Sequence, residues 1–211
     1  MCCGDASLTV SRETRALEFF GEKAGAALRF AELLATTAIE RGLIGPKEGE
    51  RIWERHVENC LPLTTLIPKV ANKRASLADI GSGAGLPGVV VALARPDLKV
   101  TLIEPLARRC EFLFEVIDEL SLDIEVIRGK SELLKGKYDF LTARAVAPLS
   151  RLLETTWHLL KPGGSLLAIK GESASDEMAA ADLSKVSKSS LHEIKMADIP
   201  VSRVVELIKA G

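Results

Sequence analysis

One stretch, "LADIGSGAGLPGVVVALARPDLKVTLIEP" at residues 77–105, constrains the fold more than any other part of the chain. It predicts an apolar strand, a loop with four glycines, a helix, and a second strand that ends in the carboxylate Glu104. Glycines permit a tight turn and a close approach of a ligand, and the N–H groups of the following helix face the same space. In an open α/β sheet, ligands bind at the carboxyl ends of the strands. The stretch therefore predicts a site for a nucleotide-like cofactor at this edge of a sheet.

The glycine pattern fits two cofactors. Gly83, Gly85 and Gly88 match the dinucleotide pattern G-x-G-x-x-G, and Glu104 follows about 20 residues later, where an acid binds the ribose in NAD enzymes. Gly81 instead begins a G-x-G-x-G spacing with Gly83 and Gly85, which is usual in Rossmann-like methyltransferases. Glu104 suits both interpretations, because two ribose hydroxyls can bind one carboxylate.

Two neighbours of the glycines favour S-adenosylmethionine over a dinucleotide. Asp79 lies inside an apolar strand, where a buried carboxylate is costly unless it meets a donor or a cation. S-adenosylmethionine carries an α-ammonium group and a sulfonium, whereas a pyrophosphate would be repelled by Asp79. Pro87 suits a first helical turn, but it lacks the N–H that a phosphate would need there. The methyl donor is therefore the favoured cofactor, and the dinucleotide stays as the alternative.

The chain after Ser76 alternates short apolar segments with amphipathic ones. This alternation predicts an α/β fold with a mostly parallel, doubly wound sheet and right-handed crossovers. Segment 173–190 is rich in serine, alanine and lysine, and it is compatible with either a helix or a loop. We expect strands near 77–80, 98–104, 122–127, 138–142, 163–169, 192–196 and 203–209, and helices near 86–95, 107–120 and 148–160.

Residues 1–75 are expected to form a helical extension that packs on a domain of residues 76–211. A first helix is predicted over 15–41, and a second helical region follows in "KEGERIWERHVENCLPLTTLI". The second region should direct Ile52, Trp53, Val57, Cys60 and Leu61 toward the core and place Arg51, Arg55 and His56 on its other face. The apolar face of the first helix comprises Leu17, Phe20, Ala24, Ala27, Ala31, Leu34 and Ala38.

Composition limits the possible partners of the 211-residue chain. Its 28 basic and 29 acidic residues give a formal charge of -1, so any contact with nucleic acid must come from a local patch. No apolar run reaches the ~18 residues of a membrane span, and the start does not resemble a signal peptide. The four cysteines and three histidines have neither disulfide-framework nor zinc-site spacing. These features predict a reduced, cytoplasmic enzyme without a metal and without a membrane contact.

Five motifs together resemble the RsmG (GidB) family of bacterial small-subunit rRNA guanine-N7 methyltransferases. They are "ERH" at 54–56, "DIGSGAGLPG" at 79–88, "IEPLARR" at 103–109, "ARA" at 143–145 and "KG" at 170–171. The resemblance implies a Rossmann-like class I methyltransferase fold with a seven-stranded sheet and an N-terminal helical extension. It also implies S-adenosylmethionine as donor and a guanine in 16S rRNA of the 30S ribosomal subunit as acceptor. Similar proteins usually have arginine where this chain has Lys130, so a bidentate contact is not expected there.

Site residues come partly from the resemblance and partly from the residues themselves. By resemblance, Gly81 and Leu86 line the cofactor, Ser131 and Glu132 form the adenine turn, and Arg144 follows the fourth strand. The residues themselves predict that the cofactor contacts the loop glycines, the acid before the loop and the acid that binds the ribose. These are Gly81, Gly83, Gly85, Asp79 and Glu104.

The chemistry of N7 methylation needs no general base, because guanine N7 has a lone pair and no proton to lose. Catalysis is then positioning, and Arg144 is expected to contact the methionine end of the cofactor, a phosphate, or guanine O6 alone. RNA contacts are predicted for Arg55, His56, Lys130 and Lys170, in a patch that could include Lys69, Lys73, Arg74, Arg108 and Arg109.

We expect a monomer that acts on the 30S particle. The alternatives are a methyltransferase acting on another RNA or on a small molecule, and a non-catalytic ribosome-assembly factor that keeps the cofactor fold.

Overall fold

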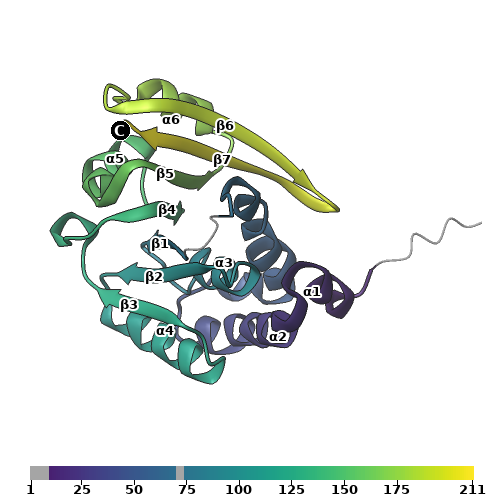
Figure 1. The fold of residues 1–211 in the computed structure, drawn as a ribbon. Coiled ribbons are helices and arrows are strands. Elements are labelled where there is room, and N and C mark those ends of the chain that lie inside the picture. Colours follow the sequence, from purple (N-terminus) through teal and green to yellow (C-terminus); the bar gives the residue numbers. More distant parts are fainter. Residues whose placement is uncertain (1–9, 70–73) are drawn as a thin grey trace, which may run out of the picture.

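The computed structural model describes residues 10–69 and 74–211. Cys2, Cys3 and Lys73 lie outside the described residues. Seven strands form one sheet in the order β3-β2-β1-β4-β5-β7-β6, as Figure 1 shows. Only the pairs that contain β7 are antiparallel. The strands are β1 Ala75–Ile80, β2 Leu98–Glu104, β3 Ile124–Arg128, β4 Tyr138–Arg144, β5 Leu160–Lys170, β6 Val186–Met196 and β7 Ile199–Lys209.

Each strand lies where the sequence predicts one, although β6 and β7 begin earlier than expected, at Val186 and Ile199. The start of β6 contains serines and lysines, which are weak strand formers, and β6 is an edge strand, where such polar residues are tolerated. Segment 173–190, which the sequence left open, contains helix α6, Ala174–Ala180, and the first residues of β6.

Helices cover both faces of the sheet. Helices α3, Gly88–Ala94, and α4, Ala107–Glu119, lie with the N-terminal helices on one face, and α5, Leu149–Thr156, lies with α6 on the other (Figure 1). Each face of the sheet has its own apolar core, and alternate residues of β1 belong to one core or the other, because successive strand side chains point to opposite faces. Leu77 belongs to the first core, and Ala78 belongs to the second. Across residues 10–69 and 74–211, no helix is long and apolar enough to cross a membrane.

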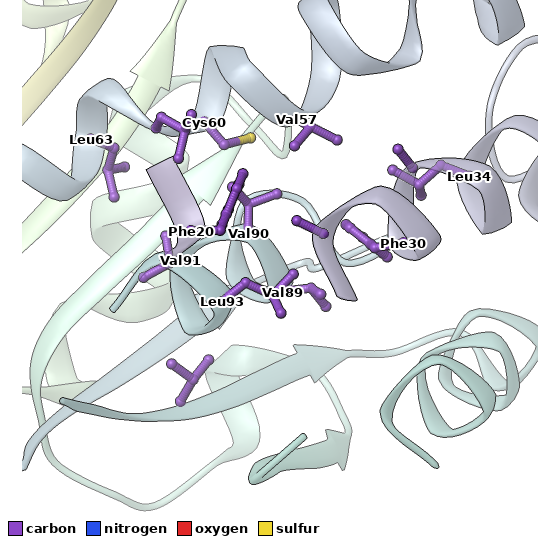
Figure 2. Packing of buried hydrophobic residues seen from close by; sticks show 14 of the residues in the cluster. Phe20, Phe30, Leu34, Val57, Cys60, Leu63, Val89, Val90, Val91 and Leu93 are labelled. Atoms are coloured by element: carbon purple, nitrogen blue, oxygen red, sulfur yellow. The ribbon is translucent and has the colours of Figure 1, made fainter. Parts of the chain in front are cut away.

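The N-terminal helical segment differs from the predicted single helix. Helix α1, Arg12–Phe20, ends at Gly21, whose φ of +52° interrupts the helix, and a short 3-10 turn leads into α2, Ala24–Leu33. A π turn over Leu34–Ala38 continues helix α2. Leu17 was predicted to face the core, but it is 64% exposed. The other six residues of the predicted apolar face are buried in the same apolar cluster as α3, and Phe20 lies beside Val90 of α3 (Figure 2).

The second helical region consists of short turns rather than one regular helix. A π turn over Trp53–Val57 lies among 3-10 turns over Pro46–Arg51, Glu58–Cys60 and Pro62–Leu66. The residues predicted to face inward are all buried, and Trp53 Nε1 donates a hydrogen bond of 2.8 Å to Glu58 Oε1. One apolar cluster joins this segment to the sheet, so the division of the chain at residue 75 remains an interpretation.

Candidate active site

A cavity of about 440 Å³ opens at the carboxyl ends of β1, β2, β3 and β4. Parallel strands bring their carboxyl ends to one edge, so residues far apart in the sequence meet here. Five of the predicted site residues line the cavity: Gly81, Glu104, Lys130, Ser131 and Glu132. Ser131 and Glu132 lie on a 3-10 turn over Ser131–Leu133 that follows β3, as the predicted adenine turn requires.

The glycine loop has the tight backbone that its sequence predicts. Gly81 has a φ of +64°, and a Cβ atom there would lie 2.9 Å from Val146 Cγ2. Gly85 has a φ of +92°, and a Cβ atom there would lie 2.7 Å from Val89 Cγ2. A side chain at either position would be strained in conformation and crowded by its neighbour. Gly83, Gly85 and Leu86 do not line the cavity, and their predicted cofactor contacts stay predictions.

Glu104 is fully buried at the end of β2, and its carboxylate organises the loops around the cavity. Its Oε2 accepts a hydrogen bond of 2.9 Å from the Gly83 N–H, and its Oε1 accepts one of 2.9 Å from the Leu106 N–H. A carboxylate offers about four lone-pair sites, so two remain for hydroxyl donors of a ligand. Glu104 therefore has the capacity that the predicted ribose contact needs.

Arg109 lines the same cavity from the first turns of α4. Its Nη1 lies 3.6 Å from Glu104 Oε2, while its Nε is buried and has no hydrogen-bond partner among the described residues. Arg109 was expected only as a possible member of the RNA patch, and its position on the cavity wall was not predicted. The short distance in sequence between Glu104 and Arg109 could have indicated it. A helix that directly follows a strand begins at the carboxyl end of that strand, so its first turns lie beside the cavity.

Asp79 lies beneath the glycine loop rather than on the cavity wall. Its Oδ2 accepts a hydrogen bond of 3.1 Å from the Gly88 N–H, and its Oδ1 accepts one of 3.0 Å from Thr142 Oγ1. Complete burial raises the pKa of Asp79 to about 7, and the nearby Glu104 carboxylate acts in the same direction. The predicted donors are thus present within the protein itself, and the predicted contact with the cofactor stays a prediction.

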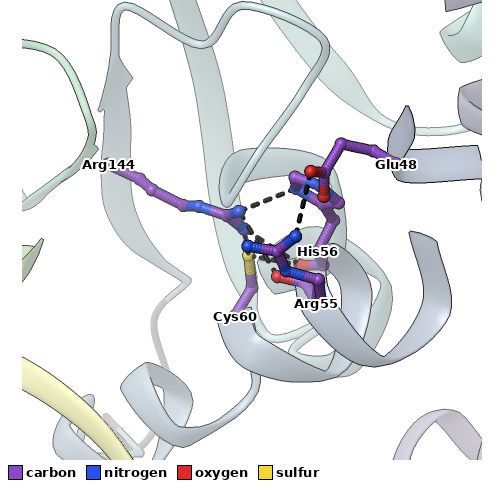
Figure 3. A network of polar contacts seen from close by, with 5 residues as sticks. All are labelled: Glu48, Arg55, His56, Cys60 and Arg144. Carbon is purple, nitrogen blue, oxygen red and sulfur yellow. Dashed lines mark hydrogen bonds and ion pairs between the residues drawn. The ribbon is translucent and has the colours of Figure 1, made fainter. Parts of the chain in front are cut away.

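Arg144, at the end of β4, extends its guanidinium toward the N-terminal segment (Figure 3). It donates hydrogen bonds to the backbone carbonyls of His56 and Arg55 at 3.1 and 3.4 Å. It also contacts Cys60 Sγ at 3.2 Å and His56 Nδ1 at 2.7 Å. The sequence predicted that Arg144 and His56 are functional, but it did not predict that they touch.

A second cavity of about 470 Å³ adjoins the first, and Arg144 contributes to its wall. The two cavities share the wall formed by residues 145–147, which directly follow Arg144. Ala145 has a φ of +53°, a left-handed conformation that costs a non-glycine residue about 1 kcal/mol or more. Strain of this kind persists only where surrounding contacts hold it, and here it occurs between the two cavities.

Comparison with known proteins decides the family. The model of the family "GidB: rRNA small subunit methyltransferase G" matches residues 24–202. The chain belongs to this family. It is 48% identical over 202 residues to ribosomal RNA small subunit methyltransferase G of Streptomyces avermitilis, covering 92% of this chain and 83% of that protein. It is 53% identical over 169 residues to the protein of the same name from Thermobifida fusca, covering 79% and 70%.

Solved structures confirm the predicted class of fold. A SAM-dependent O-methyltransferase from Thermotoga maritima superposes with a TM-score of 0.56 at 15% identity, covering 73% of this chain and 65% of that one. The strand order and the antiparallel β7 are the Rossmann-like methyltransferase arrangement that the family resemblance implied. The predicted family and the predicted enzyme class, a methyltransferase, are confirmed as well.

The predicted RNA-binding residues of this family member lie in different environments. Lys130 is exposed on the rim of the first cavity, and Arg55 is 49% exposed and forms an ion pair with Glu48 at 2.9 Å. Lys170 is largely buried, and its Nζ lies 2.7 Å from both Ala147 O and Glu177 Oε2. RNA contact by any of these residues stays a prediction, and for Lys170 two of the three ammonium donors already have partners within the protein.

No group of three or more possible metal-ligating side chains occurs within the described parts of the chain. Each of the three histidines contacts different partners: His158 Nε2 lies 3.1 Å from Leu134 O, His192 Nε2 lies 2.9 Å from Glu206 Oε2, and His56 contacts Glu48 and Arg144.

Proposed function

We propose that this protein transfers a methyl group from S-adenosylmethionine to N7 of one guanine in the 16S rRNA of the 30S subunit. The observation that carries the proposal is the cavity at the carboxyl ends of β1 to β4, with the buried Glu104 at its wall, in a member of the rRNA small subunit methyltransferase G family. The relatives with this name support the choice of rRNA as substrate.

The residues around the first cavity suit S-adenosylmethionine. Glu104 and Asp79 place two buried carboxyl groups near the glycine loop, which favours a cationic ligand and disfavours a pyrophosphate. Glu104 would hold the ribose hydroxyls, Ser131 and Glu132 would hold the adenine, and Arg109 would supply its unpartnered Nε–H. When bound, the cofactor supplies an electrophilic methyl group on sulfur, which guanine N7 can accept without losing a proton.

The second cavity is the proposed acceptor site, because residues 145–147 form its boundary with the first cavity. The protein would hold the guanine in line with the methyl group and exclude water, and neither task needs a general base. Arg144 would act through its charge, toward an anionic group or guanine O6, since four of its N–H contacts are already made within the protein. A bidentate contact to O6 and N7 would block the reacting atom.

The proposal includes a monomer in the cytoplasm that needs no metal and recognises the assembled 30S particle. A formal charge of -1 supports this last point, because a chain without an overall positive field gains little from free RNA and needs a shaped surface to bind. Among the predicted contacts, Lys130 is an exposed cation on the wall of the first cavity, and Arg55 is an exposed cation whose backbone contacts Arg144.

The test is methyl transfer from tritium-labelled S-adenosylmethionine to purified 30S subunits that lack N7-methylguanine, with 50S subunits as the control. We expect label only in the 30S rRNA, recovered as N7-methylguanosine after nucleoside analysis. Label in a different nucleoside or in a small molecule would refute the acceptor. Tight binding of S-adenosylhomocysteine without any transfer would favour a methyltransferase with a different substrate, whereas binding of 30S subunits without binding of S-adenosylhomocysteine would favour the assembly-factor alternative.

A further inference from the structure

The contacts of Arg144 connect two parts of the chain that are far apart in sequence (Figure 3). Arg144 ends β4, while His56 lies in the π turn over Trp53–Val57 and Glu48 in the 3-10 turn over Pro46–Arg51. The chain of contacts runs from Glu48 Oε2 to His56 Nε2 at 3.0 Å and from His56 Nδ1 to Arg144 Nη2 at 2.7 Å. His56 thus links Glu48 to Arg144, and Arg55 O, His56 O and Cys60 Sγ supply the other contacts of Arg144 with the N-terminal segment.

The chemistry of the partners fixes the tautomer of His56. A guanidinium has only donors, so His56 Nδ1 must be the acceptor of the hydrogen bond from Arg144. The proton of the neutral ring then lies on Nε2, where it is donated to the Glu48 carboxylate. A protonated imidazole would instead place an N–H on Nδ1 directly against the N–H of Arg144.

The groups that face His56 agree with a neutral ring. Arg144 approaches from β4, Glu48 from the preceding turn, and Arg55 from its own turn. Burial lowers the pKa of His56 below its ordinary value, and the charge of Arg144 acts in the same direction, whereas the contact with Glu48 opposes them. Burial also raises the pKa of the Cys60 thiol, so Cys60 meets Arg144 as a neutral acceptor.

Every acceptor that Arg144 uses within the described residues is therefore neutral: two carbonyls, a thiol and an imidazole nitrogen. Lys170, on the wall of the same cavity, is neutralised by Glu177 at 2.7 Å. Arg144 forms no such ion pair in the described parts of the chain, and it keeps its charge available at the cavity. The contacts fix the position of the guanidinium without cancelling its charge.

We propose that His56 and Glu48 are positioning residues for methyl transfer, which hold Arg144 at the acceptor cavity through the neutral Nε2–H form of His56. The inference rests on the proposed function, because it assigns Arg144 a role in that reaction. Protonation of His56 turns the contact between its Nδ1 and Arg144 from attractive to repulsive, which removes one of the four contacts of Arg144 and shifts the guanidinium from its position at the cavity. The rate of transfer should therefore fall on the acid side, below the ordinary histidine pKa of 6.5.

The experiment measures kcat and KM for methyl transfer to 30S subunits as a function of pH, together with the affinity for S-adenosylhomocysteine and the thermal midpoint. His56→Asn keeps an acceptor near the Nδ1 position but cannot be protonated in this pH range. His56→Leu removes the acceptor and keeps an apolar side chain in the partly buried site. His192→Asn, far along the chain in β6 and paired with Glu206, is the matched control.

We expect His56→Asn to retain most of the wild-type kcat above pH 7 and to lose the acid-side decrease. We expect His56→Leu to lower kcat on the order of tenfold or more at every pH, with a folded protein, because misplacement of a positioning group costs rate. Glu48→Gln should move the acid-side decrease to lower pH, since the carboxylate favours the protonated ring. His192→Asn should behave as the wild type does.

An active wild type with an unchanged kcat and an unchanged acid-side decrease in His56→Leu would overturn the inference and leave the proposed function intact. A decrease that persists in His56→Asn would assign the titration to another group and also overturn it. A wild type that binds S-adenosylhomocysteine but transfers no methyl group to any 30S guanine would overturn the proposed function, and the inference with it.

Discussion

Replacement of Asp79 by asparagine should change how the stability of the cofactor-free protein depends on pH. Asp79 is fully buried, and its two oxygens accept from the Gly88 N–H and from Thr142. Asparagine has nearly the same shape, and its single oxygen can accept from Gly88 while its amide donates to the Thr142 hydroxyl. The substitution therefore removes the titration of this position while the local packing stays similar.

The sign and size of the effect follow from the pKa of Asp79, which rises from 3.8 to about 7 on folding. A raised pKa means that the folded state binds the proton more tightly, so the wild type loses stability as pH rises from about 4 to about 7. One pKa unit corresponds to about 1.4 kcal/mol. Between pH 5 and pH 8, the free energy of unfolding of Asp79→Asn should rise by about 3 kcal/mol relative to that of the wild type.

The assay is urea unfolding of both proteins across this pH range. Asp139→Asn is the control, because Lys161 and Ser76 lower the pKa of Asp139 to about 2, so its contribution is lost only as pH falls below about 4. The difference between Asp139→Asn and the wild type should stay flat from pH 5 to pH 8. A flat difference for Asp79→Asn as well would refute the reasoning, since Asp79 would then be ionised throughout this range.

Three further substitutions test the site and its support. Glu104→Gln should weaken binding of S-adenosylhomocysteine, measured by calorimetry, about tenfold or more, because the amide leaves one backbone N–H without an acceptor. Gly88→Ala should lower the free energy of unfolding in urea by about 2 kcal/mol or more, since its Cβ would lie 2.3 Å from a Leu102 atom. Lys170→Met should lower it by about 1–3 kcal/mol in the same assay, because Glu177 would lose its partner in a largely buried pair.

Each of these three predictions has a result that would contradict it. Unchanged affinity in a folded Glu104→Gln would remove Glu104 from the cofactor site. Gly25→Ala is the control for Gly88→Ala, since nothing lies within 4 Å of its added Cβ in helix α2, and it should stabilise by up to about 1 kcal/mol. Equal effects of the two alanines would contradict the crowding at Gly88. A Lys170→Met variant of unchanged stability would show that the pair with Glu177 contributes nothing.

The sheet and the glycine loop could be predicted because local patterns determine them. Alternating apolar segments indicated the seven strands, and the spacing from Asp79 to Glu104 indicated the edge where the cavity lies. The error at Leu17 has a local cause, since helix α1 ends at Gly21 and the face of a short helix need not continue into the next one. Gly21 indicated that a helix could end there, but the apolar periodicity on both sides of it favoured one continuous helix.

The contacts between side chains could not be predicted, because they depend on how distant segments meet. His56 and Arg144 were both expected to be functional, yet 88 positions separate them and no pattern indicated their hydrogen bond. Asp79 was expected to need a donor, but the sequence did not show that Gly88 and Thr142 supply it beneath the loop. Arg109 was named as a possible member of the RNA patch, and helical spacing alone does not show that its side chain also lines the cavity.

The most direct test of the proposed function locates the modified base. Purified protein would be incubated with S-adenosylmethionine and 30S subunits that lack N7-methylguanine, and the 16S rRNA would then be reduced and treated with aniline, which cleaves the chain at that base. We predict cleavage at one guanine with the wild type and much weaker cleavage with Glu104→Gln. Intact 16S rRNA after incubation with a wild type that binds S-adenosylhomocysteine would contradict the account.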